Sequence, residues 1–193
     1  MIGQTGADAA AQPITSALSG VGVDTSLVAA LSGAPTGQAL ILLQPGGENS
    51  IVIIGGANQA WPEPEPLSEG ARRAIGGAAM LCLQREVPER VNVAAATAAR
   101  AARVPVLLDA GGVDAPLTPE LLALVDILSP NETELARLTG LATSDEASIV
   151  AAARSLLAKG VSAVLVSVHQ GGSDCWPLSL SLSLCVSPHQ SAR

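Results

Sequence analysis

From residue 80 onward, short apolar runs alternate with helical stretches, and this rhythm constrains the fold more than any other feature. We predict strands at 80–83, 105–108, 125–128 and 163–167, and helices at 88–103, 118–124, 129–139 and 144–159. Strands joined by helical crossovers pair in parallel with right-handed connections, and helices then cover the sheet. The sequence therefore predicts an α/β fold, with a mostly parallel sheet between two helical layers.

The composition limits which partners and sites the chain can have. Ten Lys and Arg residues against seventeen Asp and Glu residues give a net charge of −7, which disfavours nucleic acid as a partner. Lys159 is the only lysine, and no phosphate-binding G-x-x-x-x-G-K-[ST] motif occurs. No uninterrupted apolar run approaches the roughly 18 residues of a membrane span. We therefore expect a soluble intracellular protein without a membrane partner.

Two apolar runs, 38–43 and 50–54, flank the loop 45–49, and this pattern predicts a β-hairpin. A helix is predicted at 7–18, with no strand before it. The stretch 61–66 holds three prolines, which remove backbone donors, so it is predicted to be a surface connection.

The last residues, 169–193, depart from the strand–helix rhythm. The segment 179–184 reads SLSLSL, without charge and without a following helix. Such alternation can form an edge strand, but repeated dinucleotides in a message also encode alternating Ser and Leu. We predict a disordered tail from outside the domain, derived from a retained intron or a frame change. Full-length transcripts that continue with family-like coding sequence would contradict this.

Four polar residues follow predicted strand ends, where ligands bind in parallel α/β sheets: Gln84, Glu86, Asp109 and Asn131. The pairs Asn131/Glu134 and Ser129/Glu132 also have the spacing of capping boxes, which a helix needs whether or not it binds anything. Glu86 could equally be a solvated loop charge. The residues alone leave these alternatives open.

The segment 125–140, VDILSPNETELARLTG, closely resembles the ribokinase branch of the PfkB sugar-kinase family. Three further stretches support the resemblance, and the matches run in family order over about residues 3–168: PTGQAL at 35–40, GGAN at 55–58 and LQREVP at 83–88. The resemblance implies that 1–168 is a partial domain of the three-layer ribokinase-like (Rossmann-like) fold. It also implies that the hairpin at about 38–54 is part of a lid.

The same resemblance implies an ATP- and Mg²⁺-dependent kinase that converts D-ribose to ribose 5-phosphate. It places Asn131 and Ser167 at the nucleotide, Glu134 in the magnesium shell and Glu86 at the sugar. Asp109 takes the place of another polar residue of the family. The resemblance further implies a monovalent cation in the full-length parent, a possible homodimer through the lid hairpin, and a cytoplasmic or plastid location.

The family's opening strand with an early Asp, its G-G-K-G-A-N-Q element and its late D-T-x-G-A-G-D element have no counterpart in the sequence. The last of these carries the general-base Asp, so no catalytic residue is assigned. We therefore expect a truncated, weakly active or inactive form. Two alternatives remain: a catalytically dead α/β module that pairs with an intact kinase, and another sugar or nucleoside kinase of the family.

Overall fold

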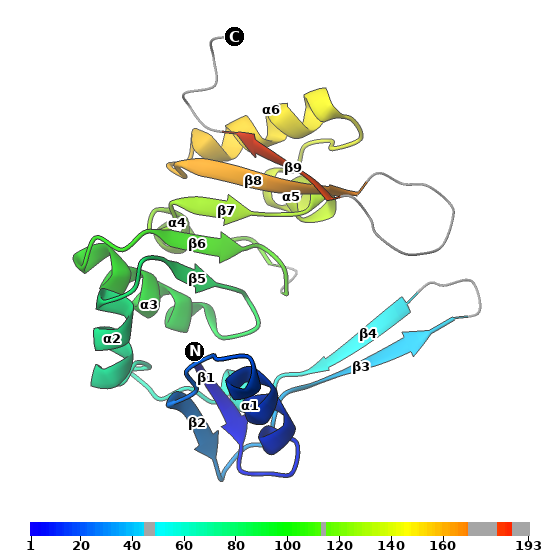
Figure 1. Cartoon of the computed structure of the whole chain (residues 1–193). Helices are drawn as coiled ribbons and strands as arrows, with labels where there is room; N and C mark the ends of the chain where they lie inside the picture. Colours follow the sequence, from blue (N-terminus) through cyan, green and yellow to red (C-terminus); the bar gives the residue numbers. More distant parts are fainter. Residues whose placement is uncertain (45–48, 113–114, 170–180, 187–193) are drawn as a thin grey trace. The chain divides into compact units, whose positions relative to one another are not determined.

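The computed structural model describes residues 1–44, 49–112, 115–169 and 181–186 (Figure 1). The chain divides into two compact units. The first comprises residues 1–73 and 86–91, and the second comprises 74–85 and 92–193. The polypeptide therefore passes from one unit to the other three times, and the six residues 86–91 return to the first unit within a stretch that otherwise builds the second.

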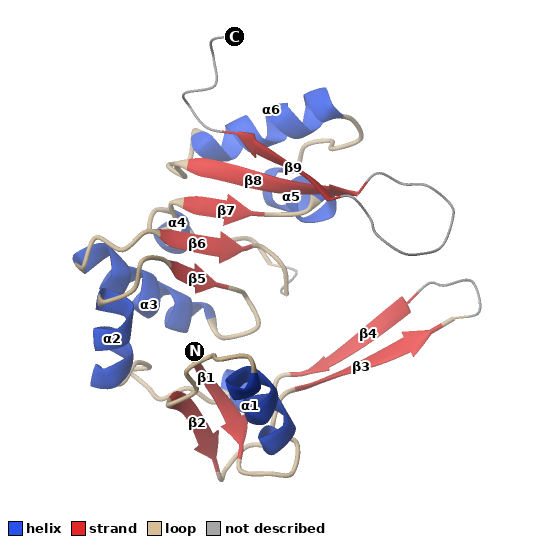
Figure 2. Cartoon of the chain, viewed as in Figure 1, coloured by secondary structure: helices blue, strands red, loops and turns tan. Residues whose placement is uncertain are grey.

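The second unit is built on a five-stranded sheet in the order β5-β6-β7-β8-β9 (Figure 2). Strands β5 to β8 are parallel, as predicted, whereas β9 is antiparallel to β8. The strands are β5 (Leu81–Leu83), β6 (Val106–Asp109), β7 (Ile127–Ser129), β8 (Ala163–His169) and β9 (Ser181–Val186).

Helices join the parallel strands and cover both faces of this sheet, which confirms the predicted α/β architecture. They are α3 (Glu89–Ala101), α4 (Pro119–Leu122), α5 (Glu132–Thr139) and α6 (Glu146–Leu157). A row of register partners, Leu108, Leu128 and Val164, crosses the middle of the sheet with no exposed surface. Burying each such side chain contributes about 1.5–3 kcal/mol, so this row fixes the order of the strands.

Strand β9 lies in the segment that the sequence assigns to a disordered tail. Its Cα partners on β8 run from Val164 opposite Val186 to His169 opposite Ser181. The structure thus favours the edge-strand interpretation for residues 181–186, because an alternating run can add one more ladder to an open sheet edge. Residues 170–180 and 187–193 lie outside the described residues, and the foreign origin of the tail stays a prediction.

The first unit begins with a β-α-β segment. Strand β1 (Ile2–Gly6) pairs in parallel with β2 (Leu27–Leu31), and α1 (Ala11–Gly20) connects them. The expectation that no strand precedes the first helix was wrong, because the short segment IGQTG lacks the apolar run on which strand prediction depends. In the described residues, no helix is long and apolar enough to cross a membrane.

The predicted hairpin is present: β3 (Gln38–Leu43) pairs antiparallel with β4 (Asn49–Ile54). A short 3₁₀ helix, η1 (Gly56–Gln59), follows it, and α2 (Glu69–Gly76) comes after the proline-rich connection. Apolar side chains emerge on both faces of the hairpin, each with 51–75% of its surface exposed: Leu40, Ile41, Leu42, Leu43, Ile51, Val52, Ile53 and Ile54.

Candidate functional site

The carboxyl ends of β6, β7 and β8 gather polar residues at one edge of the second unit's sheet. Asp109 ends β6 and pairs in register with Ser129, which ends β7. Beyond this point Asn131 forms an isolated parallel bridge with Ser167 of β8, and the Ser167 N–H donates to the Pro130 carbonyl at 3.0 Å. The two residues expected at the nucleotide are therefore neighbours.

Asn131 and Glu134 form a complete capping box at the start of α5. The Glu134 N–H donates to Asn131 Oδ1, and the Asn131 N–H donates to Glu134 Oε2, both at 2.8 Å. Of the two capping boxes that the sequence allows, the structure uses this one, with Asn131 as the N-cap. Capping therefore uses Asn131 Oδ1 and Glu134 Oε2. Glu134 Oε1 takes no part in the capping box and is available for a second role.

Glu134 Oε1 and Asp109 Oδ1 approach the same small space beside Gly111. A Cβ atom built on this glycine would lie 3.1 Å from Asp109 Oδ1 and 3.3 Å from Glu134 Oε1. The Gly111 N–H donates to Asp109 Oδ1 at 2.9 Å, which holds that carboxylate against the turn. The absent side chain thus keeps open a niche that two carboxylate oxygens border.

The niche suits a magnesium ion. Mg²⁺ prefers oxygen ligands, keeps several waters, and is usually held by one or two carboxylates together with substrate phosphates. Among the described residues, no group of three or more His, Cys, Asp or Glu side chains could hold a metal. The two carboxylates of Asp109 and Glu134 are of the kind that suits a hydrated magnesium ion.

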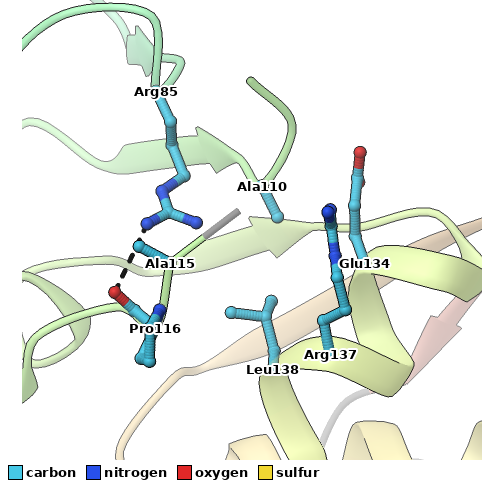
Figure 3. A pocket seen from close by; sticks show the side chains of 7 residues that line it. All are labelled: Arg85, Ala110, Ala115, Pro116, Glu134, Arg137 and Leu138. Carbon is cyan, nitrogen blue, oxygen red and sulfur yellow. Dashed lines mark hydrogen bonds between the residues drawn. The ribbon is translucent and has the colours of Figure 1, made fainter. Parts of the chain in front are cut away.

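A cavity of about 320 Å³ adjoins Glu134 (Figure 3). Its lining comprises Arg85, Ala110, Ala115, Pro116, Glu134, Arg137 and Leu138. Arg85 is only 6% exposed, and its Nη2 donates to the Pro116 carbonyl at 3.4 Å. Arg137 lies one turn after Glu134 on α5, so both side chains reach the same face of the helix. The lining thus carries three charged side chains, those of Arg85, Glu134 and Arg137.

Sequence reasoning missed Arg85, Gly111 and Arg137. The spacing of Arg137 after Glu134 was a usable signal, because residues three apart share a helix face. Nothing in the sequence pattern marks Gly111, whose importance depends on the path of the turn after β6. Arg85 directly precedes Glu86 in the LQREVP stretch and is the charged residue of that stretch that becomes buried in the second unit.

Glu86, expected at the sugar, belongs to the first unit, whereas Asn131, Glu134 and Ser167 come together in the second. Gln59 Nε2 donates to the Glu86 carbonyl at 2.8 Å. Glu86 Oε2 is buried and has no hydrogen-bond partner among the described residues. A buried carboxylate oxygen without a donor is costly, so this atom is suited to accept a hydrogen bond from a ligand hydroxyl.

The turn of the PTGQAL stretch is fixed by Asp8. The Thr36 hydroxyl and N–H donate to the two Asp8 carboxylate oxygens at 2.6 and 2.7 Å, and these bonds lower the pKa of Asp8 below its ordinary value of 3.8. The Thr36 hydroxyl oxygen in turn accepts from the Gly6 N–H at 2.9 Å. Gly56 adopts φ +51°, and a Cβ there would collide with the Pro35 carbonyl, so the GGAN stretch packs directly on this turn.

Comparison with known proteins matches this architecture to one family. The family model described as pfkB family carbohydrate kinase matches residues 1–190. A ribokinase of Arabidopsis thaliana is 44% identical over 175 residues, which cover 89% of this chain and 46% of that protein. A deoxyribokinase of Salmonella typhi is 30% identical over 173 residues, covering 90% of this chain and 56% of that protein.

Among solved structures, the Arabidopsis thaliana ribokinase complexed with ribose and ATP superposes with a TM-score of 0.82 at 44% identity. The match covers 86% of this chain and 54% of that one. The chain thus spans about half the length of the relatives that it matches. Together, the family model, the sequence identity and the shared fold show that the chain belongs to the pfkB family of carbohydrate kinases.

Proposed function

We propose that this chain forms part of an ATP- and Mg²⁺-dependent kinase that phosphorylates D-ribose to ribose 5-phosphate. The observation that carries the proposal is the pair of carboxylate oxygens, Asp109 Oδ1 and Glu134 Oε1, that border the niche at Gly111. This pair lies at the carboxyl ends of parallel strands, where α/β sheets bind their ligands. The similarity to a ribokinase whose structure contains ribose and ATP supports the choice of substrates.

In this proposal, Asn131 and Ser167 bind the nucleotide. Their backbones form a parallel bridge, and Asn131 is the N-cap of α5. A helix N-terminus favours negative charge, because its backbone N–H groups and its dipole point toward the anion. The phosphates would therefore meet the N-terminal turn of α5.

Glu134 and Asp109 would hold magnesium, largely through its water ligands. When bound, the ion neutralises negative charge on the nucleotide phosphates. The capping box orients Glu134 for this role, because Oε2 is fixed by the Asn131 N–H while Oε1 faces the niche. The Gly111 N–H similarly fixes one oxygen of Asp109. No catalytic general base is assigned to this chain, and a monovalent cation is proposed for the whole protein by resemblance alone.

Glu86 is proposed to bind the sugar. Its Oε2 atom is buried without a partner, so a sugar hydroxyl would supply the missing hydrogen bond. A site that relies on such a bond discriminates strongly against a sugar that lacks the hydroxyl, because the carboxylate would remain unpaired. Comparing ribose with 2-deoxyribose as substrates therefore also tests the alternative of a different sugar kinase in the same family.

The β3–β4 hairpin is proposed to act as a lid and as a contact in a homodimer. Its eight exposed apolar side chains leave both faces unburied. Contiguous exposed apolar surface marks an interaction site. The same observation supports the second candidate function, a catalytically inactive module that pairs with an intact kinase through this hairpin. The proposed compartment, cytoplasm or plastid, rests on the resemblance.

One assay separates the two candidates. The purified 193-residue chain is mixed with ribose, ATP and Mg²⁺, alone and together with a full-length ribokinase, and ribose 5-phosphate is measured. Product formation by the chain alone supports the kinase. If the chain alone forms no product but changes the rate at which the full-length ribokinase forms ribose 5-phosphate, the result supports the pairing module. Failure to form product and to alter the partner's rate would contradict both.

A further inference from the structure

The loop that carries Glu86 is tied to the first unit by one arginine. We propose that Arg90 is a positioning residue: it holds residues 86–91 against the segment 61–63 and so fixes the Glu86 carboxylate. This inference rests on the proposed sugar-binding role of Glu86. It assigns a function to Arg90 that neither the sequence motifs nor its place in the first turn of α3 suggests.

Arg90 contacts three successive residues of the proline-rich connection. Its Nη2 donates to the Trp61 carbonyl at 2.7 Å, its Nη1 donates to the Pro62 carbonyl at 2.9 Å, and its Nε lies 3.0 Å from Glu63 Oε1. All three nitrogens of the Arg90 guanidinium therefore contact this segment. Lysine cannot reproduce this pattern, because a single ammonium group cannot present donors in the same fixed fork.

The segment 58–63 is itself well anchored at its start. The Trp61 indole Nε1 donates to the Asn58 carbonyl at 3.0 Å, and Asn58 packs against Gly37, where a Cβ would lie 2.7 Å from Asn58 Nδ2. The prolines in the connection restrict its backbone further. Arg90 thus contacts a segment whose backbone is already restrained. A positioning contact requires such a support.

Two sets of contacts hold the backbone at Glu86 and just after it. Gln59 Nε2 binds the Glu86 carbonyl at 2.8 Å, and Arg90 anchors the chain four residues later. The Val91 N–H donates to the Pro88 carbonyl at 2.8 Å, so residues 88–91 form a turn that contains Arg90. These contacts explain why 86–91 groups with the first unit. Without the Arg90 contacts, the bond from Gln59 to the Glu86 carbonyl would still hold this loop at its start.

The test compares Arg90→Ala and Arg90→Lys with a matched arginine variant, Arg73→Ala. Arg73 pairs with Glu69 on the exposed surface of α2 in the same unit, so its removal changes charge equally without touching the loop. Ribose and Mg·ATP affinities are measured by calorimetric titration of the full 193-residue chain. Amide hydrogen exchange over 86–91 is measured in parallel.

We expect Arg90→Ala to weaken ribose binding about tenfold or more, since misplacing a binding group by about 1 Å has large effects. Mg·ATP affinity should stay within about twofold of the wild type, because the nucleotide residues lie in the other unit. Arg90→Lys should recover part of the loss, and Arg73→Ala should match the wild type. Exchange over 86–91 should accelerate only in the Arg90 variants.

Equal ribose affinity in wild type and both Arg90 variants would overturn the inference. So would a parallel loss of ribose and nucleotide affinity, which indicates general destabilisation. If Arg90→Ala does not fold, Arg90→Lys decides alone. If the wild-type chain does not bind ribose, the proposed function is wrong for this chain, and unchanged exchange over 86–91 in the Arg90 variants would then separately refute the positioning role.

Discussion

Replacing Asn131 with alanine separates the structural role of this residue from its proposed role at the nucleotide. The substitution removes Oδ1, which accepts the Glu134 N–H at 2.8 Å. Losing an N-cap side chain costs about 0.5–2 kcal/mol, so the melting temperature should fall by a few degrees. If Asn131 also contacts phosphate, the affinity for Mg·ATP should fall by about tenfold in addition, equivalent to about 1.4 kcal/mol.

The chain supplies a matched control at the start of α6. Asp145 forms the same kind of capping box with Ser148: the Ser148 N–H donates to Asp145 Oδ1 at 2.8 Å, and the Asp145 N–H donates to Ser148 Oγ at 3.1 Å. Asp145→Ala should lower the melting temperature by a similar amount and leave Mg·ATP affinity unchanged. A second variant, Asn131→Ser, keeps a good N-cap but loses the amide group.

The assay pairs thermal unfolding, followed by circular dichroism, with calorimetric titration of Mg·ATP. We expect Asn131→Ser to melt like the wild type and still bind nucleotide less tightly. Equal melting losses in Asn131→Ala and Asp145→Ala, with wild-type nucleotide affinity in both, would refute the reasoning. Asn131 would then be a helix cap and nothing more.

Three further predictions test other parts of the structure. Gly111→Ala should raise the Mg²⁺ concentration needed for half-maximal nucleotide binding by roughly tenfold, because its methyl group enters the niche next to Glu134 Oε1; an unchanged Mg²⁺ titration would contradict the metal site. Ile41→Glu should shift any dimer toward monomer in light scattering after gel filtration without lowering the melting temperature, since Ile41 is 55% exposed; an unaltered mass would exclude the hairpin as the contact. Asp8→Asn should destabilise the chain at pH 7 in urea unfolding. The bonds from Thr36 lower the pKa of Asp8, so its stabilisation is fully present above the ordinary pKa of 3.8 and is lost as the pH falls through the lowered value. The difference between variant and wild type should therefore shrink below about pH 3.8; a pH-independent difference would show that the carboxylate charge is not involved.

The sequence predicted the second unit well because its signals are local. Buried parallel strands appear as short branched runs, and the capping-box spacing of Asn131 and Glu134 marks the start of α5. The first unit was predicted less completely. Strand β1 reads IGQTG and owes its position to pairing with β2, which no local pattern reveals. Helix α2 follows three prolines, and its amphipathic pattern spans only two turns.

The candidate site was likewise predicted only in part from the sequence. The resemblance singled out Asn131, Glu134 and Ser167, and the structure brings these three together at one sheet edge. The niche itself could not be predicted, because it depends on the turn that carries Gly111 past Glu134. The sequence also could not predict that Glu86 belongs to the first unit. This placement results from hydrogen bonds across 27 and more positions, from Gln59 and Arg90, which no periodicity encodes.

The proposed kinase function requires that the carboxyl ends of β6 and β7 hold a magnesium-bound nucleotide. Calorimetric titration of the wild-type chain and of Glu134→Gln with ATP, with and without Mg²⁺, measures this binding. Gln preserves the capping box while removing the charge from the niche. We expect saturable, Mg²⁺-dependent binding by the wild type, and binding by Glu134→Gln that Mg²⁺ enhances far less. Nucleotide binding that is absent, or that responds to Mg²⁺ identically in both proteins, would contradict the proposed function.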